Sequence, residues 1–450
     1  MNIEWGVIND FLIMSVLLLI ASGIVRSIPV FRKIAVPANI IAGVIFLILG
    51  PEVLELVDVS YKRFGTYVYH LLPLIFIAMG LGSAAQNKKS SIQNKKSSIV
   101  SSGVILSIGY GTQAVIGLLV VQLYSMVSSS ELFPNFGYML MLGFGQGPGQ
   151  AYSLGSTWEN AGFANGGSLG LTFAAFGYLW AAIPGVLIVS WFNNKSKTEK
   201  NEYFAEQSKV VVNDNSNLTH QVAWVAFVYF ITYSLLKFID INFLTQKTKL
   251  IMQLKGTLWG VHFIIAALLS IATKKILTRF KKSELINNDS MTKLSGVFLD
   301  FMVVAAIAAI SLKVLREYLT IIILMTSIGG IAMIGLVYLL IQKSKLDYPL
   351  GRFAVLFGTL TGTLSTGLTL NRMVDPEFKT SAAQDVVMGA GISVPLTIPI
   401  FATFLIPLFG QGQSDPNFYY WINILILAAY TMALYISWRV FVVKKSVVTS

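Results

Sequence analysis

Long apolar runs, separated by short polar and charged segments, dominate the sequence. Most reach about 18 residues, the length a helix needs to cross a hydrocarbon core about 30 Å thick. The runs are continuous and do not alternate between apolar and polar positions, so they predict helices and not the strands of a membrane barrel. The predicted spans are residues 7–25, 35–50, 67–86, 99–126, 166–192, 220–241, 256–273, 294–312, 318–342, 384–409 and 418–438.

Composition supports an all-α integral membrane protein. Of the 450 residues, 55% are hydrophobic and 12% charged, whereas soluble domains carry about 25% charged residues. The net charge of +12 arises largely from Lys and Arg between the spans, which is typical of topogenic charge and not of nucleic-acid binding. With the N-terminus outside and the C-terminus cytoplasmic, most of these residues lie on the inner side of a plasma (inner) membrane.

The residue types that enzymes use are scarce. There is no cysteine, and the three histidines, His70, His220 and His262, are far apart in sequence. No HExxH motif and no nucleophile–base pair is present. These observations favour a transporter over an enzyme.

Two apolar stretches, 136–158 and 350–371, are interrupted and predict re-entrant hairpins. The first contains four glycines and Pro148 within Gly143–Gly149, and in a helix each glycine costs about 1 kcal/mol and proline about 3. The second, Gly358–Gly367, is rich in threonine. Backbone freed in this way must lie within protein or line a wet cavity, where carbonyls bind cations and N–H groups bind carboxylates. The competing interpretation is ordinary packing of small residues.

The elements recur in the same order in two halves. The first repeat is predicted at 1–192 and the second at 220–409, joined by a cytoplasmic linker at 193–219, with an extra helix and cytoplasmic tail at 410–450. Five crossings per half is an odd number, so the second half enters the membrane inverted. Gly147 and Gly362 are 215 residues apart, as are other glycine and proline pairs of the two halves.

Few charged residues lie within spans. Asp300 is a functional candidate or an interfacial acid. Arg372, at the end of the second hairpin, suits either a substrate carboxylate or the membrane rim. Arg352 is expected to anchor the hairpin entry, and Lys237 and Asp240 are expected to pair along one helix.

Several stretches resemble the glutamate:sodium symporters. They are Val36–Gly43, Gly145–Tyr152, Ala175–Gly177 and, at lower similarity, Gly362–Asn371, and the likeness covers about residues 5–410. It implies Na⁺-coupled L-glutamate uptake, movement of a hairpin-bearing core and a homodimer. The chain departs from the family pattern at Gln146, Pro148, Gln150 and Ser365, which puts the substrate in question, and the last span follows the family's usual end.

The predicted site combines both hairpins. The predicted substrate-binding residues are Gly145, Gln146, Gly147, Gly149, Gln150, Thr363, Ser365, Thr366 and Arg372. The predicted Na⁺ ligands are Gln146, Thr361, Ser365 and Asp300. The alternatives are a Na⁺- or H⁺-coupled transporter of another carboxylate or amino acid, with Asp300 as the titratable group, and a passive channel.

Overall fold

The computed structural model describes residues 5–28, 37–82, 92–128, 131–196, 218–245, 248–376 and 378–440. These residues form helices and connecting segments, with no strand among them. Nine of the described helices are long and apolar enough to cross a membrane, or ten if a pair bent by 54° at Val261 counts as one span. The predicted all-α class is confirmed, and the predicted spans coincide with these helices or, for 35–50, with a shorter apolar helix.

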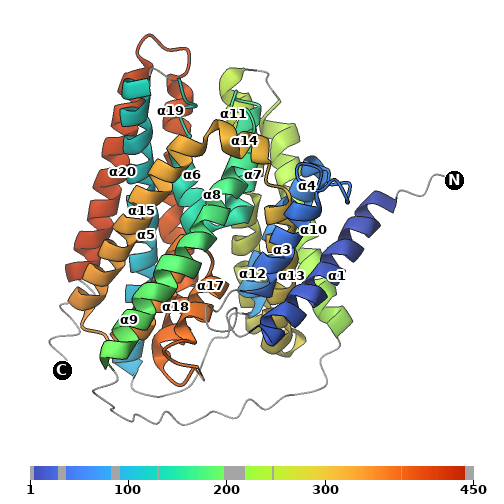
Figure 1. Ribbon diagram of the computed structural model, residues 1–450, viewed down its shortest axis with the longest axis vertical. Coiled ribbons are helices and arrows are strands. Elements are labelled where there is room, and N and C mark those ends of the chain that lie inside the picture. The colour runs from blue at the N-terminus through green and yellow to red at the C-terminus, as the bar shows by residue number, and fades with distance from the viewer. Residues whose placement is uncertain are drawn as a thin grey trace.

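The helices follow one another along the chain as Figure 1 shows. The first half contains α1 (Trp5–Ser27), α3 (Ala38–Leu49), α4 (Tyr61–Gly82), α5 (Ile92–Ser128), α6 (Tyr138–Leu140), η1 (Met141–Gln146), α7 (Pro148–Glu159), α8 (Gly166–Trp180), η2 (Ala181–Gly185) and α9 (Val186–Ser196). The second half contains α10 (Leu218–Phe243), α11 (Lys249–Gly260), α12 (His262–Arg279), η3 (Ser283–Leu285), α13 (Asn288–Ala308), α14 (Leu312–Glu317), α15 (Leu319–Ser344), α16 (Pro349–Thr361), α17 (Leu364–Asn371), α18 (Ser381–Ala402), α19 (Leu405–Gly410) and α20 (Pro416–Trp438).

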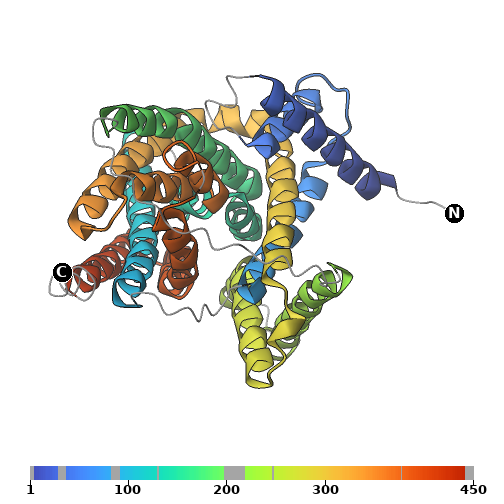
Figure 2. The ribbon, with the colours of Figure 1, turned by 90° about the horizontal axis from the view of Figure 1, so that it is seen from below.

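The helices gather into two groups that lie side by side when the molecule is seen from below (Figure 2). In the flanking group, α1, α3 and α4 pack with α10, α12 and α13. In the core group, α5 to α9 pack with α15 to α20. Each half of the chain therefore contributes its first helices to one group and its later helices to the other.

Small residues let helices of opposite halves approach closely. A Cβ added to Gly43 of α3 would lie 2.7 Å from Ile307 of α13, within the flanking group. A Cβ added to Gly103 of α5 would lie 2.5 Å from the carbonyl of Gly389 of α18, within the core group. Without an aqueous hydrophobic effect between them, membrane helices associate through such tight packing.

The core group contains two helix–break–helix segments. The first hairpin consists of α6, η1 and α7, with its break at Gly147, and the second consists of α16 and α17, with its break at Gly362 and Thr363. The 215 residues between Gly147 and Gly362 also separate the first residues of α8 and α18, Gly166 and Ser381. One pair of helix starts and the two breaks are thus separated by the same number of residues.

The extra helix α20 is an integral part of the core group. Tyr420 donates a hydrogen bond to the carbonyl of Leu118 at 2.7 Å, and Trp438 Nε1 donates to Ser101 Oγ at 2.8 Å. Both acceptors, Leu118 and Ser101, lie on α5, and the two donors lie near opposite ends of α20. Most of the predicted linker 193–219 and the end of the tail, 441–450, lie outside the described residues.

Candidate functional site

The tips of the two hairpins meet. Gly147 has φ +90° and ψ 179°, a conformation that is essentially restricted to glycine. A Cβ at Gly147 would lie 3.3 Å from Thr363 Cγ2 and 3.5 Å from the carbonyl oxygen of Gly362. Residues from equivalent positions of the two halves therefore form a single junction in the core group.

Four helix ends converge at this junction. η1 and α16 end there with their C-terminal carbonyls, and α7 and α17 begin there with their N-terminal N–H groups. Helix C-termini carry partial negative charge and attract cations, whereas N-termini carry partial positive charge and attract anions. The backbone alone thus offers places for a cation and for a carboxylate close to one another.

Threonine hydroxyls stabilise the second tip. Thr363 caps α17, because its Oγ1 accepts a hydrogen bond from the backbone N–H of Thr366 at 3.4 Å. The hydroxyls of Thr363 and Thr366 are 3.1 Å apart. Thr361 Oγ1 donates to the carbonyl of Phe357 at 2.8 Å, and this leaves its lone pairs available to a cation.

Three other predicted ligands have side chains without a described partner. Gln146 and Ser365 are half-buried and Gln150 is buried, and none of the three side chains makes a hydrogen bond to another described residue. Buried polar groups normally have partners. Free polar side chains on both tips are consistent with a site that a ligand completes.

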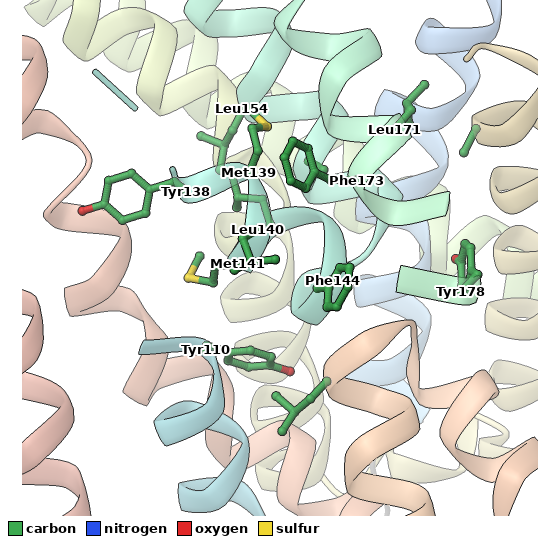
Figure 3. Packing of buried hydrophobic residues seen from close by; sticks show 14 of the residues in the cluster. Tyr110, Tyr138, Met139, Leu140, Met141, Phe144, Leu154, Leu171, Phe173 and Tyr178 are labelled. Atoms are coloured by element: carbon green, nitrogen blue, oxygen red, sulfur yellow. The ribbon is translucent and has the colours of Figure 1, made fainter. Parts of the chain in front are cut away.

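Protein encloses the first hairpin on its core side. Tyr138, Met139, Leu140, Met141 and Phe144 are all fully buried. Figure 3 shows them among aromatic and aliphatic side chains of α5, α7 and α8. The break is thereby kept away from hydrocarbon, as an interrupted helix at membrane depth requires.

The second arm of the first hairpin faces the flanking group. A Cβ at Gly149 would lie 2.5 Å from Leu72 of α4 and 3.0 Å from Met302 of α13. Gly65 of α4 likewise packs against the ring of Tyr152. The predicted site therefore lies beside the boundary between the two groups.

Two predicted residues lie away from the tips. Arg372 is exposed at the C-terminal end of α17, about 12 Å of helix from Thr363, and its guanidinium lies 5.4 Å from the centre of the Phe378 ring. Asp300 lies on α13 in the flanking group and accepts a hydrogen bond from Asn39 Nδ2 at 2.8 Å. Among the described residues, no hydrogen bond joins Asp300 to either tip.

A buried ion pair holds the base of the second hairpin, and the sequence does not reveal it. Arg352 of α16 is 2% exposed and donates to Asp385 Oδ2 of α18 at 2.7 Å. Ser98 of α5 donates to the same carboxylate oxygen, and Arg352 Nε donates to the carbonyl of Asp347 at 2.6 Å. Arg352 was expected to anchor the hairpin entry, and in the structure it is buried and bonded to Ser381 and Asp385 of α18.

A second unanticipated residue, Gln113 of α5, reaches the end of α16. It is fully buried, and its Nε2 donates to the carbonyl of Leu360 at 2.6 Å. The sequence signal was one of only two glutamines, Gln113 and Gln122, within the apolar span 99–126. Lone amides in membrane helices commonly hydrogen-bond a neighbouring helix, but which helix cannot be deduced from one span.

No group of three or more His, Asp or Glu residues suited to a metal occurs in the described ranges. A site for Na⁺ can be made from neutral oxygens, and the junction supplies such oxygens from helix ends, threonines and glutamines.

Most of the chain matches the model of a known protein family. The family model of the sodium/glutamate symporters matches residues 3–349, which include the first hairpin and end where α16 begins. Among curated proteins, no relative matches the chain. A match over more than three quarters of the 450 residues, together with the long apolar helices, makes this multi-pass chain a member of the sodium/glutamate symporter family.

Proposed function

We propose that the protein carries L-glutamate across the plasma membrane by symport with Na⁺. The observation that carries this proposal is the contact between Gly147 and the Gly362–Thr363 break. It places two N-terminal and two C-terminal helix ends at one point, an arrangement suited to a substrate carboxylate next to a cation. Family membership supports the choice of Na⁺ and glutamate.

Substrate and ion would bind at the tips. The carboxylate would contact the N-terminal ends of α7 and α17, where Gly147, Gly149, Gln150, Thr363, Ser365 and Thr366 lie, with Gly145 and Gln146 on the preceding turn. Na⁺ would contact the carbonyl ends of η1 and α16 with Gln146, Thr361 and Ser365. A cation beside the carboxylate raises the affinity for it, and by linkage the substrate raises the affinity for Na⁺ to the same degree.

Arg372 and Asp300 have weaker support as ligands. Arg372 would need to leave Phe378, and α17 would need to bring it toward the tip. For Asp300 to act as a ligand, the substrate or the ion would have to pass along α13, away from the tips. We retain both as proposals because each lies on an element that adjoins a tip.

Alternating access would arise from movement of the core group against the flanking group. The two halves would be inverted repeats, and the hairpins would be re-entrant, one from each side of the membrane. At the contact surface between the groups, Gly65 makes room for the side chain of Tyr152 and Gly149 for that of Leu72, so these contacts would have to change as the groups move. The buried ion pair of Arg352 and Asp385 would keep the second hairpin attached to the moving group.

The deciding experiment is uptake of labelled L-glutamate into proteoliposomes that contain the full chain. It compares an inward Na⁺ gradient with K⁺ or choline, and it includes competing dicarboxylates and amino acids. Accumulation that requires Na⁺ and is blocked by glutamate analogues supports the proposal. Na⁺-dependent uptake of another carboxylate would show that the substrate is not glutamate. Uptake driven only by a pH gradient would show that the coupling ion is H⁺ and not Na⁺.

Orientation has its own test. We propose that the N-terminus is outside and the C-terminus cytoplasmic, because basic residues occupy the last turns of α1, α12 and α15, at Arg26, Arg279 and Lys343. The chain has no cysteine, so single cysteines can be introduced at exposed Lys313 and Lys345. A membrane-impermeant maleimide applied to intact cells should label Lys313→Cys only. Chemical cross-linking in membranes would test the expected homodimer.

A further inference from the structure

A fully buried amide connects the two hairpin tips. Gln113 of α5 donates through Nε2 to the carbonyl of Leu360, in the last turn of α16. The last carbonyls of a helix have no partner within the helix. Gln113 therefore satisfies one of the carbonyls that the break in the second hairpin leaves free.

The orientation of this amide follows from its partner. A carbonyl can only accept, so the NH₂ group must face Leu360 and Oε1 must point away from it. Oε1 is buried and has no hydrogen-bond partner among the described residues. A Cβ added to Gly145 would lie 2.5 Å from this oxygen, so Oε1 points at the turn that precedes Gly147.

Glycine at position 145 makes room for the amide. Any side chain there would collide with Gln113 Oε1 and with the ring of Tyr110, which would lie 2.8 Å from the added atom. Figure 3 shows the Tyr110 ring beside the end of η1. The oxygen is thus held against the carbonyl end of η1 and close to the carbonyl end of α16.

Gln113 Oε1 is thus a buried acceptor beside the carbonyl ends of two helices, and no positively charged group from the described part of the chain is bonded to it. We propose that Gln113 Oε1 is a ligand for a monovalent cation bound at the junction of the hairpin tips. This inference rests on the proposed function and names a residue for its ion site. Two sources can supply the charge: Na⁺ itself, or the α-ammonium group of an amino-acid substrate.

The test measures the thermal stability of the purified full chain in detergent. Na⁺ is titrated without substrate, and in a second arm glutamate and glutarate, which lacks the ammonium group, are compared in choline. The variants are Gln113→Met, which removes both polar atoms, and Gln113→Glu, which keeps an oxygen but loses the donor. The matched control is Asn135→Leu, because Asn135 is also a fully buried amide that donates to a backbone carbonyl, that of Phe404 at 2.9 Å.

We expect Gln113→Met to raise the half-maximal Na⁺ concentration by about tenfold or more, equivalent to the loss of one good ligand contact. Gln113→Glu should keep the Na⁺ response, and Asn135→Leu should leave it unchanged. If the ammonium group of the substrate supplies the positive charge, Gln113→Met should abolish stabilisation by glutamate but leave stabilisation by glutarate unchanged. Either pattern supports the proposal.

Other results would overturn it. A wild-type protein that responds neither to Na⁺ nor to glutamate has no such cation site. If Gln113→Met leaves the responses to Na⁺ and to glutamate unchanged, or if Gln113→Met and Gln113→Glu lose them equally, Gln113 serves only as a hydrogen-bond donor to Leu360. A wild type that is stabilised by Na⁺ but does not transport glutamate would refute the proposed substrate and leave the role of Gln113 standing.

Discussion

Gly147 and Thr363 lie against each other, although 215 residues separate the breaks to which they belong. Each lies between two helical arms, so small changes at either residue act on four helix ends.

Substitution of Gly147 should abolish transport. Its φ of +90° with ψ near 180° is strained by about 1–3 kcal/mol for any other residue, and a Cβ would press on Thr363. We expect Gly147→Ala to lower Na⁺-driven uptake at least tenfold. The matched control is Gly162→Ala, since Gly162 also has positive φ (+101°) but faces open space. Equal losses in both variants would attribute the effect to backbone strain alone.

The pair of Arg352 and Asp385 should dominate the stability of the second hairpin. Removal of one partner leaves a buried charge unpaired, which costs about 3–5 kcal/mol. Asp385→Leu should therefore lower the Tm strongly, and the double variant Arg352→Met/Asp385→Leu should recover much of the loss. The exposed pair of Asp289 and Lys293 provides the control, because Asp289→Asn should change stability by less than about 1 kcal/mol. A double variant no better than the single one would contradict the argument.

Glu52 should make the segment that links it to the start of α14 sensitive to acid. Its carboxylate accepts hydrogen bonds from Ser311 Oγ and from the backbone N–H groups of Leu312 and Lys313, at the start of α14. Burial acts to raise the pKa of Glu52, but hydrogen bonds from Tyr61, Ser311, Lys313 and Leu312 outweigh it and lower the pKa below 4.5.

Because the pKa is lower in the folded protein, this contribution to stability is complete above about pH 4.5 and is lost as the pH falls through the lowered value. Thermal unfolding at pH 7 and at pH 3.5 to 4 checks the sign. Glu52→Gln should lower the Tm at pH 7 and reduce its fall in acid. Glu284→Gln, at an exposed carboxylate without a described hydrogen bond, should do neither.

Tyr138 should couple the first hairpin to α20. Its hydroxyl donates to Asn423 Oδ1 at 3.0 Å and lies 2.8 Å from Thr403 Oγ1. Tyr138→Phe leaves a buried amide oxygen unpaired, at a cost of about 1–3 kcal/mol. A lower Tm is expected, whereas Tyr338→Phe, at an exposed tyrosine, should have no effect. No change in Tyr138→Phe would show that water replaces the hydroxyl.

The spans and the breaks were predictable because both depend on local composition. About twenty apolar residues in a row form a helix in lipid wherever they lie, and a cluster of glycine and proline ends a helix regardless of its neighbours. The predicted breaks at Gly147 and near Gly362 are therefore found in the structure.

Pairings between helices were not predictable, because they depend on which helices become neighbours. Lys237 and Asp240 were expected to pair along α10, and this was wrong: Asp240 pairs with Lys255 of α11 at 2.7 Å, and Lys237 lies over the ring of Tyr233. The partners of Arg352 and Gln113 lie 33 and 247 residues away. The order of the helices along the chain does not indicate which residues so far apart in the sequence become neighbours.

The exchange of helices between the two groups has a consequence for biosynthesis. α4 packs chiefly on α12 and α13, which leave the ribosome long after α4 has entered the membrane. Until then, Gly80 has no Ser270 to pack against and Asn39 has no Asp300. Until α12 and α13 are made, helices α1, α3 and α4 therefore form an incomplete assembly in the bilayer, exposed to chaperones and to quality-control proteases. A nascent chain arrested before residue 288 should be degraded faster than one arrested after residue 308.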